Sequence, residues 1–254
     1  MQIVVPMAGA GRRFAERGYS LPKPLIAIDG VPMVVRAVRD LPAASRIVLV
    51  CNRDHIRDHQ LDRVLDQWLP NCQVVVTPGL TEGQACSVAI AEPHLNADEP
   101  VLVAACDNTH TYDAKQFAAL TADPELDALV WTYRDESRVL VRPQWYGWVV
   151  ADERGAIRRI GVKQTVSDTP ERDDVISGTF WFRSARFMLD GIQRLVASNQ
   201  RVNGEFYLDS VAAMLVEEGR KVKVFRTEKY IGWGTPDELE DYCRWRDYFA
   251  RRAA

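Results

Sequence analysis

The chain opens with an apolar run that ends in small residues and two arginines, and a lysine between two prolines follows after a short gap. The two stretches read Ile3-Val4-Val5-Pro6-Met7-Ala8-Gly9-Ala10-Gly11-Arg12-Arg13-Phe14 and Leu21-Pro22-Lys23-Pro24-Leu25-Ile26. The apolar run is typical of a buried strand, and glycine lets the backbone turn sharply beside a ligand. The prolines preset the position of Lys23. Backbone N–H groups at a strand end together with fixed cations suit a polyphosphate, although a plain strand–turn–helix start with surface arginines is the alternative.

A second apolar run ends in a carboxylate. It reads Val101-Leu102-Val103-Ala104-Ala105-Cys106-Asp107-Asn108. Open α/β sheets bind ligands at the carboxyl ends of their strands, and hard cations take oxygen ligands. Asp107 is therefore a candidate Mg²⁺ ligand. Its alternative role, capping the next helix, suits Asp113 better because Asp113 stands directly before that helix.

The composition limits the class of protein. The 254 residues are 47% apolar, enough for a sizeable core, and the net charge is −3 without a basic block, so nucleic acid is not an expected partner. We find no leader pattern and no apolar run of about 18 residues, so no membrane association is expected. The five cysteines are scattered without a Cys-x-x-Cys pair, which favours a reduced, cytoplasmic compartment.

Short apolar segments alternate with helical ones in the first half of the chain. Residues 47–50 and 74–76 read as buried strands, and residues 54–69 as a charged helix between them. This alternation predicts stacked βαβ units and a parallel sheet. Residues 146–160 read as a β-hairpin with a glycine turn. Pro236 opens an amphipathic C-terminal helix, whose aromatic residues are expected to serve packing rather than ligand binding: Tyr242, Trp245 and Phe249.

The two N-terminal stretches together resemble the signature of the nucleotidyltransferases that activate sugar 1-phosphates. In that family Gly-Gly-x-Gly-Thr-Arg is followed, after a short gap, by Pro-Lys-Pro-Leu; this chain has Gly9-Ala10-Gly11-Arg12-Arg13 and Pro22-Lys23-Pro24-Leu25. The resemblance implies that Arg13 and Lys23 are the catalytic arginine and lysine. It implies nucleotide contacts from the loop, where Ala8 stands at a family glycine and Arg12 replaces a Thr or Ser. The nucleotide-binding residues implied there are Ala8, Gly9, Gly11 and Arg12.

The resemblance extends to two further nucleotide-side positions. Gly83 and Gln84 loosely match a family loop that contacts the nucleobase, and a Gln amide can read a base edge because it both donates and accepts hydrogen bonds. A simple helix N-terminus is the alternative. Asp107 falls on the family's metal-binding aspartate, which implies Mg²⁺ as the cofactor, and Cys106 replaces the glycine before it.

In the second half the resemblance is looser and implies acceptor contacts. Lys163 lands on a lysine that contacts the acceptor phosphate, but its Glu and Pro neighbours in the family are missing. Ser177 and Gly178 take the places of residues that line the sugar. Glu205, in Gly204-Glu205-Phe206-Tyr207-Leu208-Asp209, would accept hydrogen bonds from acceptor hydroxyls. A solvated hairpin end for Lys163 and an ordinary helix-start acid for Glu205 are the alternatives.

The largest departure from the family pattern falls at Gly232. The family has an aspartate there, its second metal ligand, before a Gly-Thr-Pro that this chain keeps at residues 234–236. Either another carboxylate replaces it, with Glu205, Asp209 and Glu228 as candidates, or Mg²⁺ is held mainly by Asp107 and substrate phosphates.

We therefore expect a single nucleotidyltransferase domain over residues 1–254, with no appended acyltransferase-like repeat domain. The expected fold is α/β, a Rossmann-like, mixed and mostly parallel sheet with a small β-rich acceptor-binding subdomain. The nucleotide-binding part would cover about residues 1–135 and the acceptor-binding part about 136–235, followed by a helix over 236–254.

The expected activity joins an NTP to a sugar 1-phosphate or a related small phosphorylated acceptor and releases pyrophosphate. Such an enzyme would serve nucleotide-sugar and capsule or cell-surface polysaccharide biosynthesis. Two alternatives stay open: a cytidylyltransferase for a non-sugar, phosphocholine-like phosphate or phosphonate, and a non-catalytic nucleotide-binding regulatory subunit. A glycosyltransferase with an Asp-x-Asp metal site is disfavoured because the stretch Cys106-Asp107-Asn108 lacks the second aspartate. The base, the acceptor and a homo-oligomeric state are left open.

Overall fold

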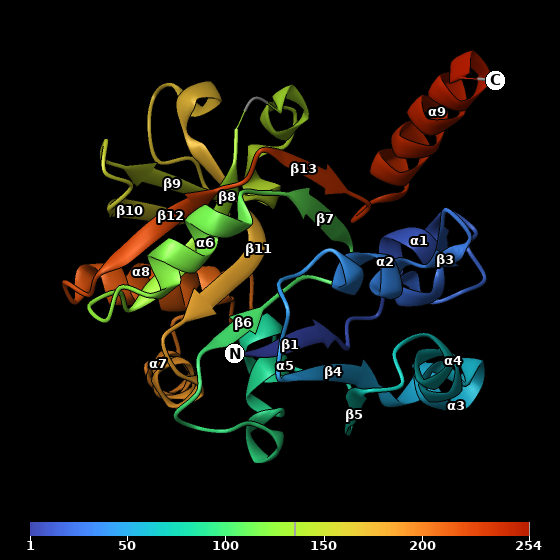
Figure 1. Cartoon of the computed structure of the whole chain (residues 1–254), viewed down its shortest axis with the longest axis horizontal. Helices are drawn as coiled ribbons and strands as arrows, with labels where there is room; N and C mark the ends of the chain where they lie inside the picture. Colours follow the sequence, from blue (N-terminus) through green and yellow to red (C-terminus); the bar gives the residue numbers. More distant parts are fainter. Residues whose placement is uncertain (135, 254) are drawn as a thin grey trace.

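The strand β1 (Gln2–Met7) lies in the middle of the sheet in the computed structural model, which describes residues 1–134 and 136–253 (Figure 1). It pairs in parallel with β4 (Arg46–Asn52) on one side and β6 (Val101–Val103) on the other. The strand β5 (Cys72–Thr77) extends the parallel part beyond β4. These central strands are rich in Val, Ile and Leu because parallel strands are covered on both faces.

The long strand β11 (Asp174–Phe182) joins the parallel part to an antiparallel part. It pairs with β6 and with β8 (Ala128–Tyr133), and β12 (Val222–Arg226) adds to β8 in parallel. The hairpin of β9 (Gly147–Ala151) and β10 (Ile157–Val162) attaches to the start of β11. These nine strands form one sheet within the described residues. The expected mixed α/β fold is confirmed.

Two short antiparallel pairs lie outside the main sheet. The first joins β2 (Ala27–Ile28) to β3 (Val31–Pro32). The second joins β7 (Asn108–Thr111) to β13 (Lys229–Gly232). The β7–β13 pair places Gly232 opposite Asn108, directly after Asp107. The position of the missing family aspartate is therefore beside the expected metal ligand.

Helices cover both faces of the sheet. They are α1 (Arg12–Glu16), α2 (Met33–Arg39), α3 (Arg53–His59), α4 (Leu61–Trp68), α5 (Gln84–Ala89), α6 (Ala114–Thr121), α7 (Ala185–Ala197), α8 (Leu208–Glu217) and α9 (Pro236–Ala253). Short 3₁₀ turns are η1 (Lys23–Leu25), η2 (Glu92–His94), η3 (Ser137–Leu140), η4 (Pro143–Trp145) and η5 (Pro170–Arg172). Because side chains alternate along β1, Val4 packs in the cluster under α5, α7 and α8, whereas Ile3 and Val5 pack in the cluster under α2, α4 and α6.

The structure corrects two expected elements. The helix expected over residues 54–69 is two helices, because Gln60 has a left-handed φ of 51° between α3 and α4. The apolar run before Asp107 is a strand only as far as Val103. Asp113 caps α6, as expected, with its carboxylate accepting backbone N–H groups at 2.8 and 3.1 Å. The expected boundary at residue 135 and the last residue, 254, lie outside the described residues.

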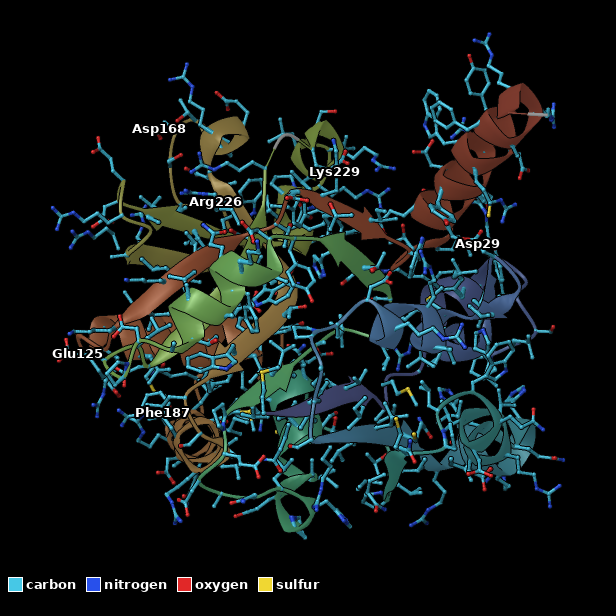
Figure 2. All side chains as sticks on the ribbon, viewed as in Figure 1. Asp29, Glu125, Asp168, Phe187, Arg226 and Lys229 are labelled. Carbon is cyan, nitrogen blue, oxygen red and sulfur yellow. The ribbon has the colours of Figure 1, made fainter. Side chains whose placement is uncertain are left out.

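The helix α9 projects away from the body of the molecule (Figure 1). At its base Tyr242 packs edge-on against Trp233 and donates a hydrogen bond to Asp29, which Figure 2 shows beside the helix. Further along, the side chains of Trp245 and Phe249 are 55% and 62% exposed. These two rings stack on each other, with ring centres 5.9 Å apart, rather than on the body of the molecule. No helix of the described residues has the length and apolar character needed to span a bilayer.

The buried carboxylate of Asp174 links three strands, β8, β11 and β12, through hydrogen bonds. Asp174, at the start of β11, is fully buried and receives two hydrogen bonds from Arg134 at 2.9 and 3.1 Å. Arg226, at the end of β12 (Figure 2), donates to the same carboxylate at 2.9 Å. The hydroxyl of Thr132 on β8 donates to it as well. Charge-assisted hydrogen bonds of this kind are about twice as strong as neutral ones.

We expect Asp174→Asn to lower the free energy of unfolding by about 2 kcal/mol, because both guanidinium groups lose their carboxylate while the shape is kept. Urea unfolding at pH 7 measures this change. The matched control is Asp98→Asn, which removes an ion pair between two exposed side chains, Asp98 and Arg186. That variant should differ from the wild type by less than about 0.5 kcal/mol. Equal effects of the two substitutions would contradict the conclusion that the Asp174 carboxylate stabilises the fold.

Candidate active site

The glycine loop between β1 and α1 is held close to Lys23. Gly11 has a φ of 63°, in the left-handed region that favours glycine. A Cβ on Gly11 would lie 3.5 Å from the Cβ of Lys23, so the loop and the lysine are in van der Waals range. The side chain of Asn52, at the end of β4, donates to the carbonyl oxygen of Ala8 at 3.1 Å. The sheet therefore fixes the loop from one side and leaves its other side facing a cleft.

A first cleft of about 460 Å³ lies against this loop. Its lining includes every residue that the sequence predicted for the nucleotide, namely Ala8, Gly9, Gly11, Arg12, Gly83 and Gln84. Gly83 and Gln84 lie at the start of α5, where α5 packs beside β1. The structure brings the two predicted nucleotide segments, which are 70 residues apart in the chain, to one cleft.

A second cleft of about 390 Å³ opens toward the antiparallel part of the sheet. It is lined by three of the four residues predicted for the acceptor, Lys163, Ser177 and Gly178. Glu205, the fourth, lines the first cleft instead. The carboxylates that line the second cleft include Asp107 and Asp209, the latter at the start of α8.

Lys23 stands where the two clefts meet, because it lines both of them, as do Pro6, Gln84 and Cys106. Its Nζ atom donates to Oδ2 of Asp107 at 2.6 Å, and the two side chains are only 22% and 20% exposed. Burial works against the charge on the lysine, but the neighbouring Asp107 carboxylate more than offsets it. The pKa of Lys23 is therefore raised, and the lysine stays protonated at neutral pH.

Arg13 points to the acceptor side rather than to the first cleft. It is not among the described residues that line either cleft, and its guanidinium carbon lies 4.2 Å from the ring centre of Trp145, which lines the second. Arg12, the additional arginine, lines the first cleft. The two neighbouring arginines therefore have different surroundings, since Arg12 lines the first cleft and Arg13 lies over a ring that lines the second, a division that the family pattern did not suggest.

The donor set near Asp107 suits Mg²⁺ only when substrate phosphates are included. A Cβ on Gly232 would lie 2.8 Å from a ring carbon of Tyr230, so the tyrosine ring fills the place of the missing family aspartate. Within the described ranges no group of three or more His, Cys, Asp or Glu side chains is arranged to bind a metal. Mg²⁺ commonly uses one or two carboxylates together with phosphate oxygens and water. Asp107 with nucleotide phosphates fits that requirement, whereas Glu205 and Asp209 line opposite clefts.

A family model described as the MobA-like NTP transferase domain matches residues 3–174 of the chain. The chain belongs to this family. The match covers the glycine loop, Lys23, Asp107 and Lys163, and it confirms the enzyme class expected from the sequence, a nucleotidyltransferase.

Relatives and solved structures extend the likeness along the chain. The bifunctional protein GlmU of Staphylococcus epidermidis is 24% identical over 228 residues, which are 89% of this chain and 48% of GlmU. The GlmU of Bacillus velezensis is 25% identical over 234 residues, 89% of this chain and 47% of the relative. The chain therefore spans about half the length of these curated relatives.

The structural likenesses concern the fold alone. A nucleoside-diphosphate-sugar pyrophosphorylase from Vibrio cholerae RC9 superposes with a TM-score of 0.75 at 18% identity, covering 95% of this chain and 99% of that one. The inositol-1-phosphate CTP transferase from T. maritima superposes with a TM-score of 0.68 at 19% identity, covering 93% and 90%.

The sequence did not single out the aromatic residues of this NTP transferase's second cleft. They are Trp145, Tyr146, Tyr207 and Tyr230. The sequence did contain a signal for Tyr207 and Asp209, because both belong to the segment of residues 204–209 in which Glu205 was predicted to contact the acceptor. Tyr230 and Trp145 gave none, since a tyrosine in a short strand and a tryptophan after a proline turn look like packing residues.

Asp209 is a buried carboxylate with little room around it. It is 7% exposed, and a Cβ on Gly147 would lie only 2.2 Å from its Oδ2 atom, so that position on β9 has to be glycine. Burial raises the pKa of Asp209 above its ordinary value of 3.8, and Lys163 only partly opposes that rise. The folded protein therefore carries the cost of burying this negative charge at neutral pH.

We expect Asp209→Asn to be more stable than the wild type at pH 7. A carboxyl whose pKa is raised by folding contributes its stability fully below the unfolded value of 3.8 and loses it as the pH rises through the folded value. The advantage of the variant should therefore shrink as the pH is lowered toward 3.8. Urea unfolding from pH 3.5 to 8 measures both stabilities. A variant that is less stable than the wild type at pH 7 would contradict this account.

Proposed function

We propose that this nucleotidyltransferase joins an NTP to a sugar 1-phosphate or a related small polyol phosphate and releases pyrophosphate. The observation that carries the proposal is the junction of two clefts at one ion pair. The first cleft has the glycine loop and Arg12, and the second has Lys163 and hydrogen-bonding side chains. Lys23, paired with Asp107, lines both. A group transferred from one substrate to the other has to pass this point.

The reaction needs no covalent intermediate on the enzyme. An oxygen of the acceptor phosphate forms a bond to the α-phosphorus of the NTP, and the bond from that phosphorus to the oxygen of the leaving pyrophosphate breaks in line. Catalysis of this kind depends on positioning and charge neutralisation. The loop at Gly9 and Gly11 offers backbone N–H groups to the triphosphate, Arg12 adds charge, and Lys23 neutralises the oxygens around the transferred phosphorus.

Asp107 is the residue that would hold Mg²⁺. When bound, the metal ion supplies charge neutralisation to nucleotide oxygens. Lys23 and Asp107 already form an ion pair, so the carboxylate is held in a fixed orientation at the junction.

The second cleft favours an acceptor with hydroxyl groups. Its aromatic lining could suit a quaternary ammonium, as a phosphocholine-like acceptor would require. Two of these rings already face protein cations, however: Arg13 lies over Trp145, and the Nζ of Lys163 lies 5.0 Å from the ring centre of Tyr207. The buried hydroxyl of Ser177 has no partner among the described residues, and the carboxylate of Asp209 lines the same cleft. Both groups can bind acceptor hydroxyls.

The test is an acceptor panel. The protein is incubated with each NTP and Mg²⁺, alone and with sugar 1-phosphates, inositol phosphate, phosphocholine or a phosphonate, and pyrophosphate is measured. Release that requires a sugar or inositol phosphate supports the proposal. Release with phosphocholine alone favours the cytidylyltransferase alternative. NTP binding without release from any acceptor favours the regulatory subunit and overturns the proposal.

We expect Lys23→Ala to lower turnover about 10²–10³-fold in the same assay, because one charge-stabilising contact at the reacting phosphorus is lost. The matched control is Lys115→Ala, which removes an exposed lysine at the start of α6, outside both clefts. The control should keep the wild-type rate. Comparable rates for Lys23→Ala and the wild type would remove Lys23 from the mechanism. Thermal unfolding of each variant separates loss of activity from loss of fold.

A further inference from the structure

One tryptophan contacts the charged groups on the acceptor side of the junction. The guanidinium carbons of Arg13 and Arg142 lie 4.2 and 4.4 Å from the ring centre of Trp145. Its backbone carbonyl oxygen accepts a hydrogen bond from Nζ of Lys163 at 2.6 Å. The same residue lines the second cleft together with Lys23. Trp145 is therefore in contact with a cation of the glycine loop and with a cation of the acceptor cleft.

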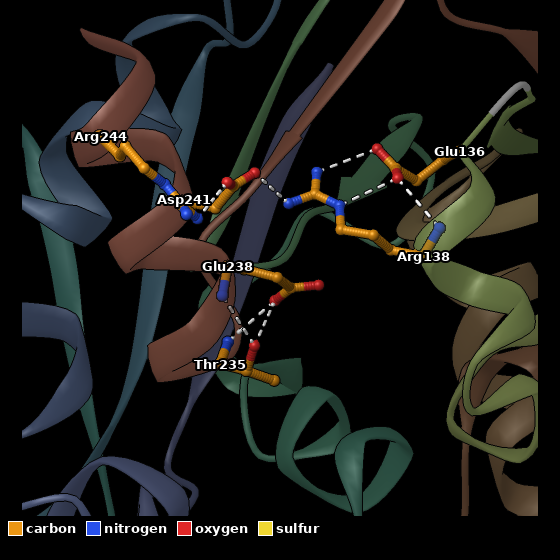
Figure 3. Close-up of polar contacts among 6 residues, drawn as sticks. All are labelled: Glu136, Arg138, Thr235, Glu238, Asp241 and Arg244. Atoms are coloured by element: carbon orange, nitrogen blue, oxygen red, sulfur yellow. Dashed lines mark hydrogen bonds and ion pairs between the residues drawn. The ribbon is translucent and has the colours of Figure 1, made fainter. Parts of the chain in front are cut away.

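The backbone of Trp145 is fixed independently of its side chain. The indole N–H of Trp148, which is fully buried, donates to the carbonyl oxygen of Pro143 at 2.9 Å and anchors η4. Figure 3 shows how the preceding turn, η3, is held, with Arg138 bonded to both Glu136 and Asp241 of α9. Replacing the indole of Trp145 would therefore leave the η4 backbone and the Lys163 hydrogen bond in place.

The ring of Trp145 gives the exposed Arg13 side chain a defined position. A long arginine side chain loses considerable rotamer entropy when it is held in one conformation. The electrostatic attraction between a guanidinium and an aromatic face offsets part of that loss. Among the described residues, no carboxylate lies within ion-pair distance of the Arg13 guanidinium and none accepts a hydrogen bond from it, so without the ring the side chain would sample several rotamers. Misplacing a group beside the reacting atoms is costly for catalysis.

We propose that Trp145 is a positioning residue that holds Arg13 on the acceptor side of the junction, so that Arg12 serves the NTP and Arg13 serves the oxygens exchanged between the two substrates. This inference rests on the proposed function. It assigns the two neighbouring arginines to different substrates, and it makes an aromatic side chain more than 130 residues away in the chain a determinant of turnover.

The kinetic test compares Trp145→Ala, Trp145→Phe and the control Trp245→Ala, whose indole is exposed on α9. With Trp145→Ala we expect kcat to fall at least about fivefold while the KM for the NTP stays within about twofold, since Arg12 and the loop are untouched. Phenylalanine keeps an aromatic face and should restore most of kcat. In the Arg13→Ala background, Trp145→Ala should change kcat by less than about twofold, because the ring acts through Arg13.

A measurement that needs no turnover follows the contact itself. The side-chain Nε–Hε resonance of Arg13, assigned by its loss in Arg13→Lys, should be shifted by the indole ring in the wild type and move to the position of a free arginine in Trp145→Ala. An active wild type with an unchanged kcat in Trp145→Ala, or equal losses with and without Arg13, overturns the positioning role alone. A wild type that is inactive with every acceptor overturns the proposed function and this inference together.

Discussion

The ion pair between Lys23 and Asp107 is the contact on which the arrangement of the site depends. Neither side chain is more than a quarter exposed, and each would carry a substantial desolvation cost without the other. Three features bring them together: the stiff Pro-Lys-Pro segment, the left-handed turn at Gly11 beside it, and the early end of β6, which frees Asp107 from the sheet. The pair marks the boundary of two clefts, so in the proposed reaction its geometry would orient both substrates.

The sequence predicted the parts of the site that depend on local chemistry. Three local features each have one dominant structural meaning: a glycine in a turn, a lysine between prolines and a carboxylate after an apolar run. The structure places the residues concerned, Gly11, Lys23 and Asp107, together. The sequence did not predict that Arg12 lines the first cleft while Arg13 lies over Trp145, because Trp145 reaches Arg13 only through the tertiary fold. The prediction of one helix over residues 54–69 was wrong for a related reason. The left-handed conformation of Gln60, which separates the two helices, cannot be recognised from the pattern of charged residues.

The effect of the glycine at position 232, where the family has an aspartate, could be understood only from the three-dimensional structure. The missing aspartate could have left an open space, but the ring of Tyr230 fills it and stacks on Tyr133 with ring centres 4.1 Å apart. Burial raises the pKa of Tyr230, and nearby Tyr133 and Asp107 add to that rise, so its hydroxyl stays neutral. A neutral aromatic group therefore stands where the family has a second carboxylate, and in the proposed reaction substrate phosphates would complete a metal site at Asp107.

The two clefts are also joined through backbone contacts, which explains why the halves of the chain act as one site. The segment that carries Glu205 and Tyr207 is hydrogen-bonded to the nucleotide loop, with the N–H of Phe206 donating to Glu82 at 2.8 Å and the carbonyl oxygen of Phe206 accepting from Ala85 at 3.0 Å. Gly83 allows this approach, because a Cβ there would lie 2.5 Å from that carbonyl oxygen. These main-chain hydrogen bonds fix the loop at Gly83 relative to the segment that carries Tyr207 and Asp209. Because the link runs through main-chain atoms, it would constrain the relative position of the two proposed substrates whatever side chains line the second cleft.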